Sequence, residues 1–275
     1  ILTAPALLQF TAGYKGAAEK VFVEVVPAEE YRRLSEAAGA VRMTRPGNVL
    51  ILGDSLSDFD RGRNYVDQLS FYLNGGGKEQ GIAFFNYGIG GDDIKRVARR
   101  VAHQFDSRKP DEYFQARYAG IDGRNYDYIL IFLGQNDTKA SSESNYATTF
   151  ITLPECEKYW ESLIATLKER FPAAKLILCS PIHTDSARQQ EIARIILAGK
   201  PNVWMFGIER HMENYDALIR KLAEKHNASY LDFYTPSKTS PERKKLFKSE
   251  DGVHLSAAGE RFVAGLVLDF FRTVK

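Results

Sequence analysis

The sequence predicts an α/β fold in which a doubly wound, mainly parallel sheet of about five strands lies between two layers of helices. Short, nearly continuous apolar runs alternate with helical patterns from residue 48 to residue 275. Such runs are typical of parallel strands that are covered on both faces. The length of 275 residues suits one large domain of this class or two small ones. Because sheets of this kind bind ligands at the carboxyl ends of their strands, functional side chains are expected there.

Five runs have the character of strands, and four other stretches have the period of helices. The expected strands cover 48–54, 82–88, 126–134, 174–181 and 228–233. The expected helices cover 94–105, 160–171, 212–222 and 262–270, where apolar residues recur at i, i+3, i+4 and i+7. Each helix therefore has an apolar stripe that can pack on the sheet.

The first 47 residues do not continue this alternation. Residues 21–26 are typical of a strand, and residues 27–39 are typical of a short helix with Pro27 near its start and Gly39 just past its end. We interpret residues 1–47 as an N-terminal extension of unknown role, either a flap or the remnant of an upstream domain. Residues 48–275 are then the main domain.

Composition narrows the choice of partners. The formal net charge is only +2, so nucleic acid is not a favoured partner. Arg96, Arg99 and Arg100 form a small basic group that is expected to be a solvated helix face. No apolar run reaches the roughly 18 residues of a transmembrane helix, so no membrane span is expected. The two cysteines, Cys156 and Cys179, are expected to be unpaired core thiols.

The sequence says less about the cellular compartment and the oligomeric state. The chain does not begin with Met, which fits a removed signal peptide as well as a trimmed chain. A secreted or periplasmic location is therefore slightly favoured over a cytoplasmic one. The oligomeric state cannot be read from the sequence.

Ser55 directly follows the first expected strand of the main domain, in the stretch GDSLSD. A serine there can be a helix N-cap, but a base, an orienting acid and an oxyanion hole would make it a nucleophile. His254 lies in a loop before the last helix, and Asp251 precedes it by three residues. That spacing lets the carboxylate reach imidazole Nδ1 while Nε2 faces outward, as a general base requires. His183 also follows an expected strand, so it is a second candidate for a base that lies with Ser55 at the carboxyl ends of the strands.

Four blocks in this order resemble those of the GDSL esterases and lipases, also called SGNH hydrolases. They are GDSLSD (53–58), NYGIGGDDI (86–94), LGQND (133–137) and DGVHLS (251–256). Each lies at a predicted strand end or in a loop. The resemblance covers roughly residues 48 to 275 and implies a three-layer, flavodoxin-like α/β/α domain. It does not extend to the N-terminal segment.

The resemblance implies a role for each matching residue. Ser55 would be the nucleophile, His254 the general base and then the general acid, and Asp251 the group that orients His254. The oxyanion hole would consist of the backbone N–H groups of Ser55 and Gly91 and the side-chain amide of Asn136.

Several neighbouring positions are assigned less directly. Gly91 is preferred to Gly88 and Gly90 because it directly precedes Asp92, as the family's glycine precedes its acidic residue. Asp54 and Asp137 are expected to hold loops by hydrogen bonds.

The expected activity is hydrolysis of short-chain acyl esters, acetyl esters above all, on a small-molecule or carbohydrate alcohol. An acyl-enzyme would form, and no metal or organic cofactor would be needed. The polar loop 57–65 follows the nucleophile, so Asp58, Arg61 and Tyr65 are candidate substrate contacts. Gln135 is a fourth candidate, because it stands where a second glycine is frequent in the family's third block and would narrow the site. The alternative for these side chains is that they merely solvate a surface loop.

Four other functions compete with this one. A nucleotide-binding module is disfavoured because GIGGDD lacks the G-x-G-x-x-G spacing. A metallohydrolase would use His183, Asp185, Asp92 and His254, but their spacing matches no dense metal motif. For Asp92 we prefer the interpretation that its charge favours the helix dipole. A non-catalytic binding protein on a hydrolase scaffold and an acyltransferase with the same serine chemistry stay open.

Overall fold

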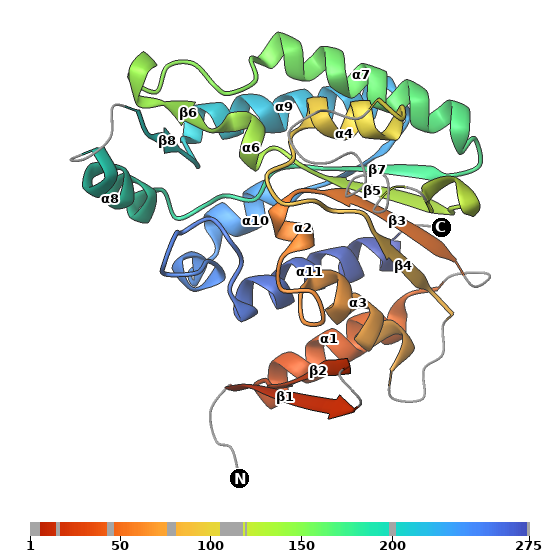
Figure 1. Ribbon diagram of the computed structural model, residues 1–275. Helices are drawn as coiled ribbons and strands as arrows, with labels where there is room; N and C mark the ends of the chain where they lie inside the picture. The colour runs from red at the N-terminus through yellow and green to blue at the C-terminus, as the bar shows by residue number, and fades with distance from the viewer. Residues whose placement is uncertain are drawn as a thin grey trace.

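Five parallel strands form the central sheet in the order β4-β3-β5-β7-β9 (Figure 1). The computed structural model describes residues 6–14, 17–42, 47–75, 81–104, 118, 120–197 and 202–273. The strands are β3 (Asn48–Gly53), β4 (Ala83–Asn86), β5 (Tyr128–Phe132), β7 (Lys175–Cys179) and β9 (Ser229–Leu231). Gly53 pairs with Phe132, Phe132 with Cys179, and Cys179 with Leu231. The loops that follow these strands therefore begin at one edge of the sheet.

Helices cover both faces of the sheet (Figure 1). One face carries α1 (Ala28–Ala40), α3 (Tyr65–Asn74) and α11 (Ala257–Thr273), and the other carries α4 (Ile94–Val101), α7 (Leu153–Arg170) and α9 (Glu209–Lys225).

Strand β3 supplies both cores. Val49 and Ile51 pack on the first face, whereas Leu50 and Leu52 pack on the second. Successive side chains of a strand point to opposite faces, so a continuous apolar run is what two covered faces require. The predicted α/β/α class is confirmed.

Short elements complete the described chain. They are α2 (Ser55–Asp58), α6 (Gln135–Thr138), α8 (Ser186–Leu197), α10 (Tyr234–Thr239), the 3-10 helices η1 (Ile121–Gly123), η2 (Ser142–Ser144) and η3 (Arg243–Leu246), and the strands β6 (Ala140–Ser141) and β8 (Trp204–Met205). The last two pair with each other in antiparallel fashion, which the sequence did not predict. Both cysteines are free and buried, as expected. None of the described helices has the length and apolar character needed to cross a bilayer.

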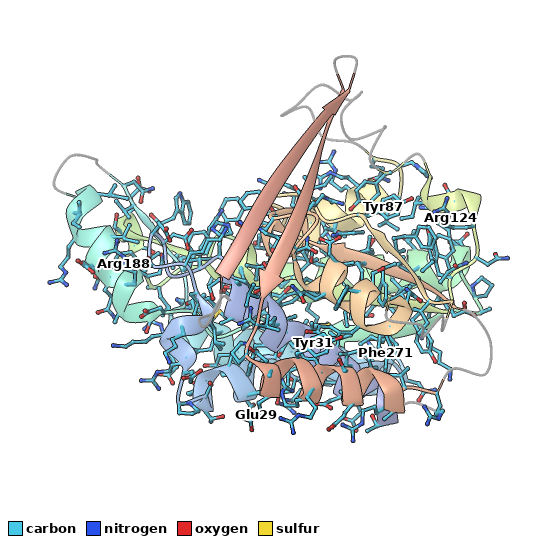
Figure 2. All side chains as sticks on the ribbon, turned by 90° about the horizontal axis from the view of Figure 1, so that it is seen from below. Glu29, Tyr31, Tyr87, Arg124, Arg188 and Phe271 are labelled. Carbon is cyan, nitrogen blue, oxygen red and sulfur yellow. The ribbon has the colours of Figure 1, made fainter. Side chains whose placement is uncertain are left out.

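A β-hairpin near the N-terminus lies outside the central sheet. Its strands β1 (Ala6–Tyr14) and β2 (Ala17–Val25) pair in antiparallel fashion. Figures 1 and 2 show the hairpin as an arm beside the helices of one face. The expectation of a single strand over 21–26 was incomplete, because β2 begins earlier and β1 was missed. The helix expected over 27–39 is α1.

Helix α1 packs on the main domain. Leu34 and Ala38 are buried in the core that includes α11. Arg261 of α11 forms an ion pair with Glu24 at the end of β2 and another, at 2.9 Å, with Glu30 of α1. The base of the hairpin is therefore tied to the last helix. The division of the chain at residue 47 stays a prediction.

Candidate active site

The turn after β3 places Ser55 at the start of α2, a helix of four residues. The Asp54 carboxylate accepts a hydrogen bond from the Leu56 N–H at 2.9 Å and so caps this helix. Gly53 is needed in the turn, because a Cβ there would lie 2.9 Å from Cβ of Ser57. The Ser55 side chain is consequently fixed at the carboxyl end of a central strand.

The loop before α11 brings His254 and Asp251 to Ser55. Nε2 of His254 lies 3.0 Å from Oγ of Ser55, and Nδ1 lies 2.6 Å from Oδ2 of Asp251. The other oxygen of Asp251 accepts hydrogen bonds from the Val253 N–H at 2.7 Å and the His254 N–H at 2.9 Å. Gly252 has a φ of +69°, a conformation that glycine adopts readily. A continuous chain of hydrogen bonds therefore joins Asp251, His254 and Ser55.

These contacts control the charge on Asp251. Partial burial by itself would raise the pKa of this carboxyl group. The hydrogen bonds from the His254 ring and from the two backbone N–H groups outweigh that effect and lower the pKa to about 2. The carboxylate is therefore ionised at all ordinary pH values and keeps the proton of a neutral His254 on Nδ1.

Two further contacts, which the sequence did not reveal, hold His254 in place. The Phe59 ring stacks on the imidazole with 4.9 Å between the ring centroids and is 45% exposed. Lys248 donates its backbone N–H to the His254 carbonyl at 2.8 Å, and its ammonium group lies 2.5 Å from Asp60. Since Asp60 follows α2, this ion pair ties the loop of Ser55 to the loop of His254.

The segments that carry Gly91 and Asn136 both contact the residues around Ser55, through Asp58 and Asp54. The N–H of Gly88 is bound to the Asn86 side chain at 3.0 Å, and that of Gly90 to the Asp58 carboxylate at 2.9 Å. Within the described part of the chain, by contrast, the N–H groups of Gly91 and Ser55 have no hydrogen-bond acceptor.

The conformation of Gly91 also suits a close approach by a ligand. Its φ is +80°, and a Cβ there would have no described atom within 4 Å. The Asn136 amide donates to the Asp92 carbonyl at 2.9 Å and lies 3.5 Å from the Asp54 carboxylate, the outer limit of a hydrogen bond.

The acidic residues of the second and third blocks form hydrogen bonds and an ion pair that hold the segments of Gly91 and Asn136. Asp93 caps α4 by accepting from the Arg96 N–H at 2.9 Å, whereas the Asp92 carboxylate pairs with Arg100. Arg100 is only 1% exposed, so the expectation that it belongs to a solvated helix face was wrong. Asp137 accepts from the Ile94 N–H at 3.0 Å. Burial raises the pKa of Asp137 to about 8, and the nearby Asp93 adds to the effect.

The four candidate substrate contacts do not form one surface. Asp58 pairs with Arg61 at 3.0 Å, and Arg61 also donates to the carbonyls of Asn86 and Gly88, so this pair braces the second block. Tyr65 is fully buried, with its hydroxyl 2.8 Å from Oγ of Ser57.

Gln135 is only 2% exposed and donates to the Ile182 carbonyl at 2.5 Å. Tyr65 and Gln135 therefore do not line an accessible site. The sequence does hold a signal for Tyr65, since Asn64 and Asp67 form a capping box that starts α3 at residue 65.

The four residues considered for a metal are not gathered in one place. Asp92 is paired with Arg100, and His254 contacts Ser55 and Asp251. His183 and Asp185 line a separate cavity together with Lys238. Among the described residues, no group of three or more His, Cys, Asp or Glu side chains is arranged to hold a metal ion.

Comparisons with known proteins identify a family and several relatives of the chain. The sequence pattern of the GDSL-like Lipase/Acylhydrolase family matches residues 51–262. An acetylxylan esterase of Geobacillus stearothermophilus is 23% identical over 233 residues, which span 78% of this chain and 90% of that protein.

Two solved structures share the fold. A lipase/acylhydrolase from Enterococcus faecalis superposes with a TM-score of 0.58 at 19% identity, over 82% of this chain and 95% of that one. A catalytic mutant of an acetylxylan esterase from Geobacillus stearothermophilus gives 0.57 at 20% identity, over 85% and 97%.

Proposed function

The chain belongs to the GDSL-like lipase/acylhydrolase family, and we propose that it is a serine esterase whose nucleophile is Ser55. The observation that carries the proposal is the hydrogen-bonded chain from Asp251 through His254 to Ser55. A serine hydroxyl is a weak nucleophile by itself, and an oriented imidazole at hydrogen-bond distance is what activates it.

Each group has one task in the proposed reaction. Oγ of Ser55 attacks the ester carbonyl while Nε2 of His254, at 3.0 Å, takes the hydroxyl proton. The same nitrogen then gives that proton to the leaving alcohol, and the acyl group stays on Ser55. Water enters, loses a proton to His254 and attacks the acyl-enzyme; the bond to Oγ breaks, the acid leaves, and His254 returns the proton to Oγ of Ser55. Every step uses a group of the chain itself, so the proposal requires no metal or organic cofactor.

The negative charge on the carbonyl oxygen would be met by three donors. The N–H groups of Ser55 and Gly91 have no acceptor among the described residues. The Asn136 amide has one N–H whose contact with the Asp54 carboxylate is long, at 3.5 Å. Neutral donors that are fixed before the reaction stabilise an oxyanion without rearrangement of the site.

We assign short acyl groups, acetyl above all, and a polar alcohol such as a carbohydrate. The sequence relative from Geobacillus stearothermophilus is an acetylxylan esterase, which supports this choice. The side chain of His254 is 27% exposed, so water can reach the base. Access of water favours hydrolysis over transfer of the acyl group to a second alcohol.

The test is hydrolysis of p-nitrophenyl esters of increasing acyl length by the wild type and by Ser55→Ala. Ser162→Ala, at an exposed serine of α7, is the matched control. We expect activity that falls with acyl length, that is lost in Ser55→Ala and that is unchanged in the control. Substantial ester cleavage by a folded Ser55→Ala variant would exclude Ser55 as the nucleophile. Product analysis in the presence of an added alcohol separates hydrolysis from acyl transfer.

A further inference from the structure

Two exposed aromatic rings lie next to the loops that carry Gly91 and Asn136. Phe150 is 38% exposed and Trp204 is 41% exposed. The two rings meet edge to face with 5.3 Å between their centroids. A single exposed aromatic ring is common, but apolar side chains that form a contiguous exposed patch mark an interaction site. We call this pair the aromatic platform.

Backbone hydrogen bonds connect the platform to the residues around Ser55. The Phe150 N–H donates to the Lys139 carbonyl at 2.7 Å, and the Ile151 N–H to the Asp137 carbonyl at 3.2 Å, directly after Asn136. Trp204 is held by the pairing of β8 with β6, in which it lies opposite Ser141. The platform is therefore built on the same short segment that carries Asn136.

Arg96 connects the platform to Gly91. Its guanidinium group donates to the Gly91 carbonyl and lies 5.9 Å from the centroid of the Phe150 ring. A cavity of about 260 Å³ lies here, lined by the start of α4 and by Phe150, Ile151 and Glu155. The exposed Phe59 ring also lies close to the second block, since a Cβ at Gly90 would lie 2.7 Å from it. Exposed aromatic rings are thus near Gly90 directly and near Gly91 by way of Arg96.

The chemistry of this surface matches a saccharide chain. A pyranose ring presents C–H groups on its faces, which suit the electron-rich face of an aromatic ring, and hydroxyl groups around its edge, which suit charged and amide groups. The Lys139 ammonium lies 4.4 Å from the centroid of the Phe150 ring and 5.8 Å from that of Trp204, so a sugar shares this surface with a cation that can donate to its hydroxyl groups. The cavity beside Phe150 offers such groups in Lys95, Arg99 and Glu155. A long acyl chain would need a continuous apolar lining instead, and a protein partner would need a surface of about 20 residues or more.

We propose that Phe150 and Trp204, together with the cavity at the start of α4, bind sugar units adjacent to the esterified one. The leaving alcohol is then part of a saccharide chain that lies across the second block. This inference rests on the proposed esterase function, but the binding it predicts can be measured without catalysis.

Trp204 provides the readout. The chain has two tryptophans, and the other one, Trp160, is fully buried and donates to the Tyr215 hydroxyl at 2.8 Å. A sugar that stacks on Trp204 should change the fluorescence of that residue and protect it from quenching by acrylamide. The protein for this titration is the Ser55→Ala variant, and the probes are xylohexaose, cellohexaose and mannohexaose.

At least one of the three oligosaccharides is expected to change the fluorescence in a saturable way, and Trp204→Phe should remove the change. Phe150→Ala should raise the Kd roughly five- to tenfold, because an aromatic contact of this kind contributes up to about one order of magnitude in affinity. Phe71→Ala, at an exposed ring on α3, should leave the Kd unchanged.

Failure of the proposed sugar site can be told apart from failure of the proposed esterase function. If no hexasaccharide changes the fluorescence, or if Phe150→Ala and Phe71→Ala bind equally well, the platform is not a sugar site, whatever the enzyme does with p-nitrophenyl acetate. If the oligosaccharides bind at the platform but the wild type cleaves no ester, the proposed function fails and the binding site stands. In an active enzyme, Phe150→Ala and Trp204→Ala should raise KM for acetylated oligosaccharides by a larger factor than KM for p-nitrophenyl acetate.

Discussion

Replacing Asp54 by Asn should change the free energy of unfolding, relative to the wild type, in favour of the variant as the pH rises towards neutral. The Asp54 carboxyl group is 1% exposed, and burial raises its pKa to about 6 although the Leu56 N–H, the charge on His254 and the Asn136 amide all act in the opposite direction. The ordinary value is 3.8. Ionisation of this group in the folded protein is therefore unfavourable by about 3 kcal/mol relative to the unfolded chain.

The sign follows from the two pKa values. Well below pH 3.8 the carboxyl group is protonated in both the folded and the unfolded state, so its burial carries no cost of ionisation. Between pH 3.8 and about 6 the unfolded chain loses the proton first, so stability falls as the pH rises, and above that window the loss is constant. Asparagine has the same shape and no charge to bury. The free energy of unfolding of Asp54→Asn should therefore rise, relative to the wild type, by about 2 kcal/mol between pH 4 and pH 7.

The assay is urea unfolding of both proteins at pH 4, 5, 6 and 7, followed by tryptophan fluorescence. The quantity to compare is the difference in the free energy of unfolding between the two proteins, followed as a function of pH. Other effects of the substitution add a constant to this difference. Ser162→Ala, at an exposed serine of α7 that carries no titrating group, is the control and should give a difference that does not vary with pH. A difference for Asp54→Asn that is flat over this range, or that moves in favour of the wild type as the pH rises, would refute the reasoning.

Three further predictions concern catalysis and can be checked by steady-state kinetics on p-nitrophenyl acetate. Asp251→Asn should lower kcat by about 10³–10⁴, because the neutral amide no longer fixes the imidazole tautomer, and a loss below tenfold would contradict that role. Asn136→Ala should lower kcat by about 10²–10³ with little change in KM, as expected for a donor that acts mainly in the transition state. Lys248→Met and Asp60→Asn should each lower kcat, and the double variant should be little worse than either single one; additive losses would show that the ion pair does not act as a unit.

The central sheet was predictable because parallel strands covered on both faces leave a direct mark on the sequence. A run such as residues 48–54 must be apolar at successive positions, since its side chains enter two cores. The approach of Asp251 to His254 was also predictable, because the two residues are three apart and the contact is local. Both conclusions use only short stretches of chain.

Other features depend on partners that a short stretch does not contain. The burial of Arg100 requires the carboxylate of Asp92 from the turn before α4, so a helix rich in arginine could not show which of its charges is buried. Phe59 and Lys248 reach His254 only in the folded chain, and neither lies in a recognisable pattern. The hairpin was missed in part because its strands do not join the central sheet, whose pattern guided the prediction.

The distance along the chain between Ser55 and His254 has a consequence for the time at which activity appears. The two residues are 199 positions apart, and His254 is brought into place by the loop before α11. Helix α11 in turn packs on α1 and α3, which are made far earlier. Under the proposed mechanism, a nascent chain would carry its nucleophile long before its base and would stay catalytically silent during most of its synthesis. Recovery of ester cleavage during refolding would then report the docking of α11 rather than the formation of the sheet.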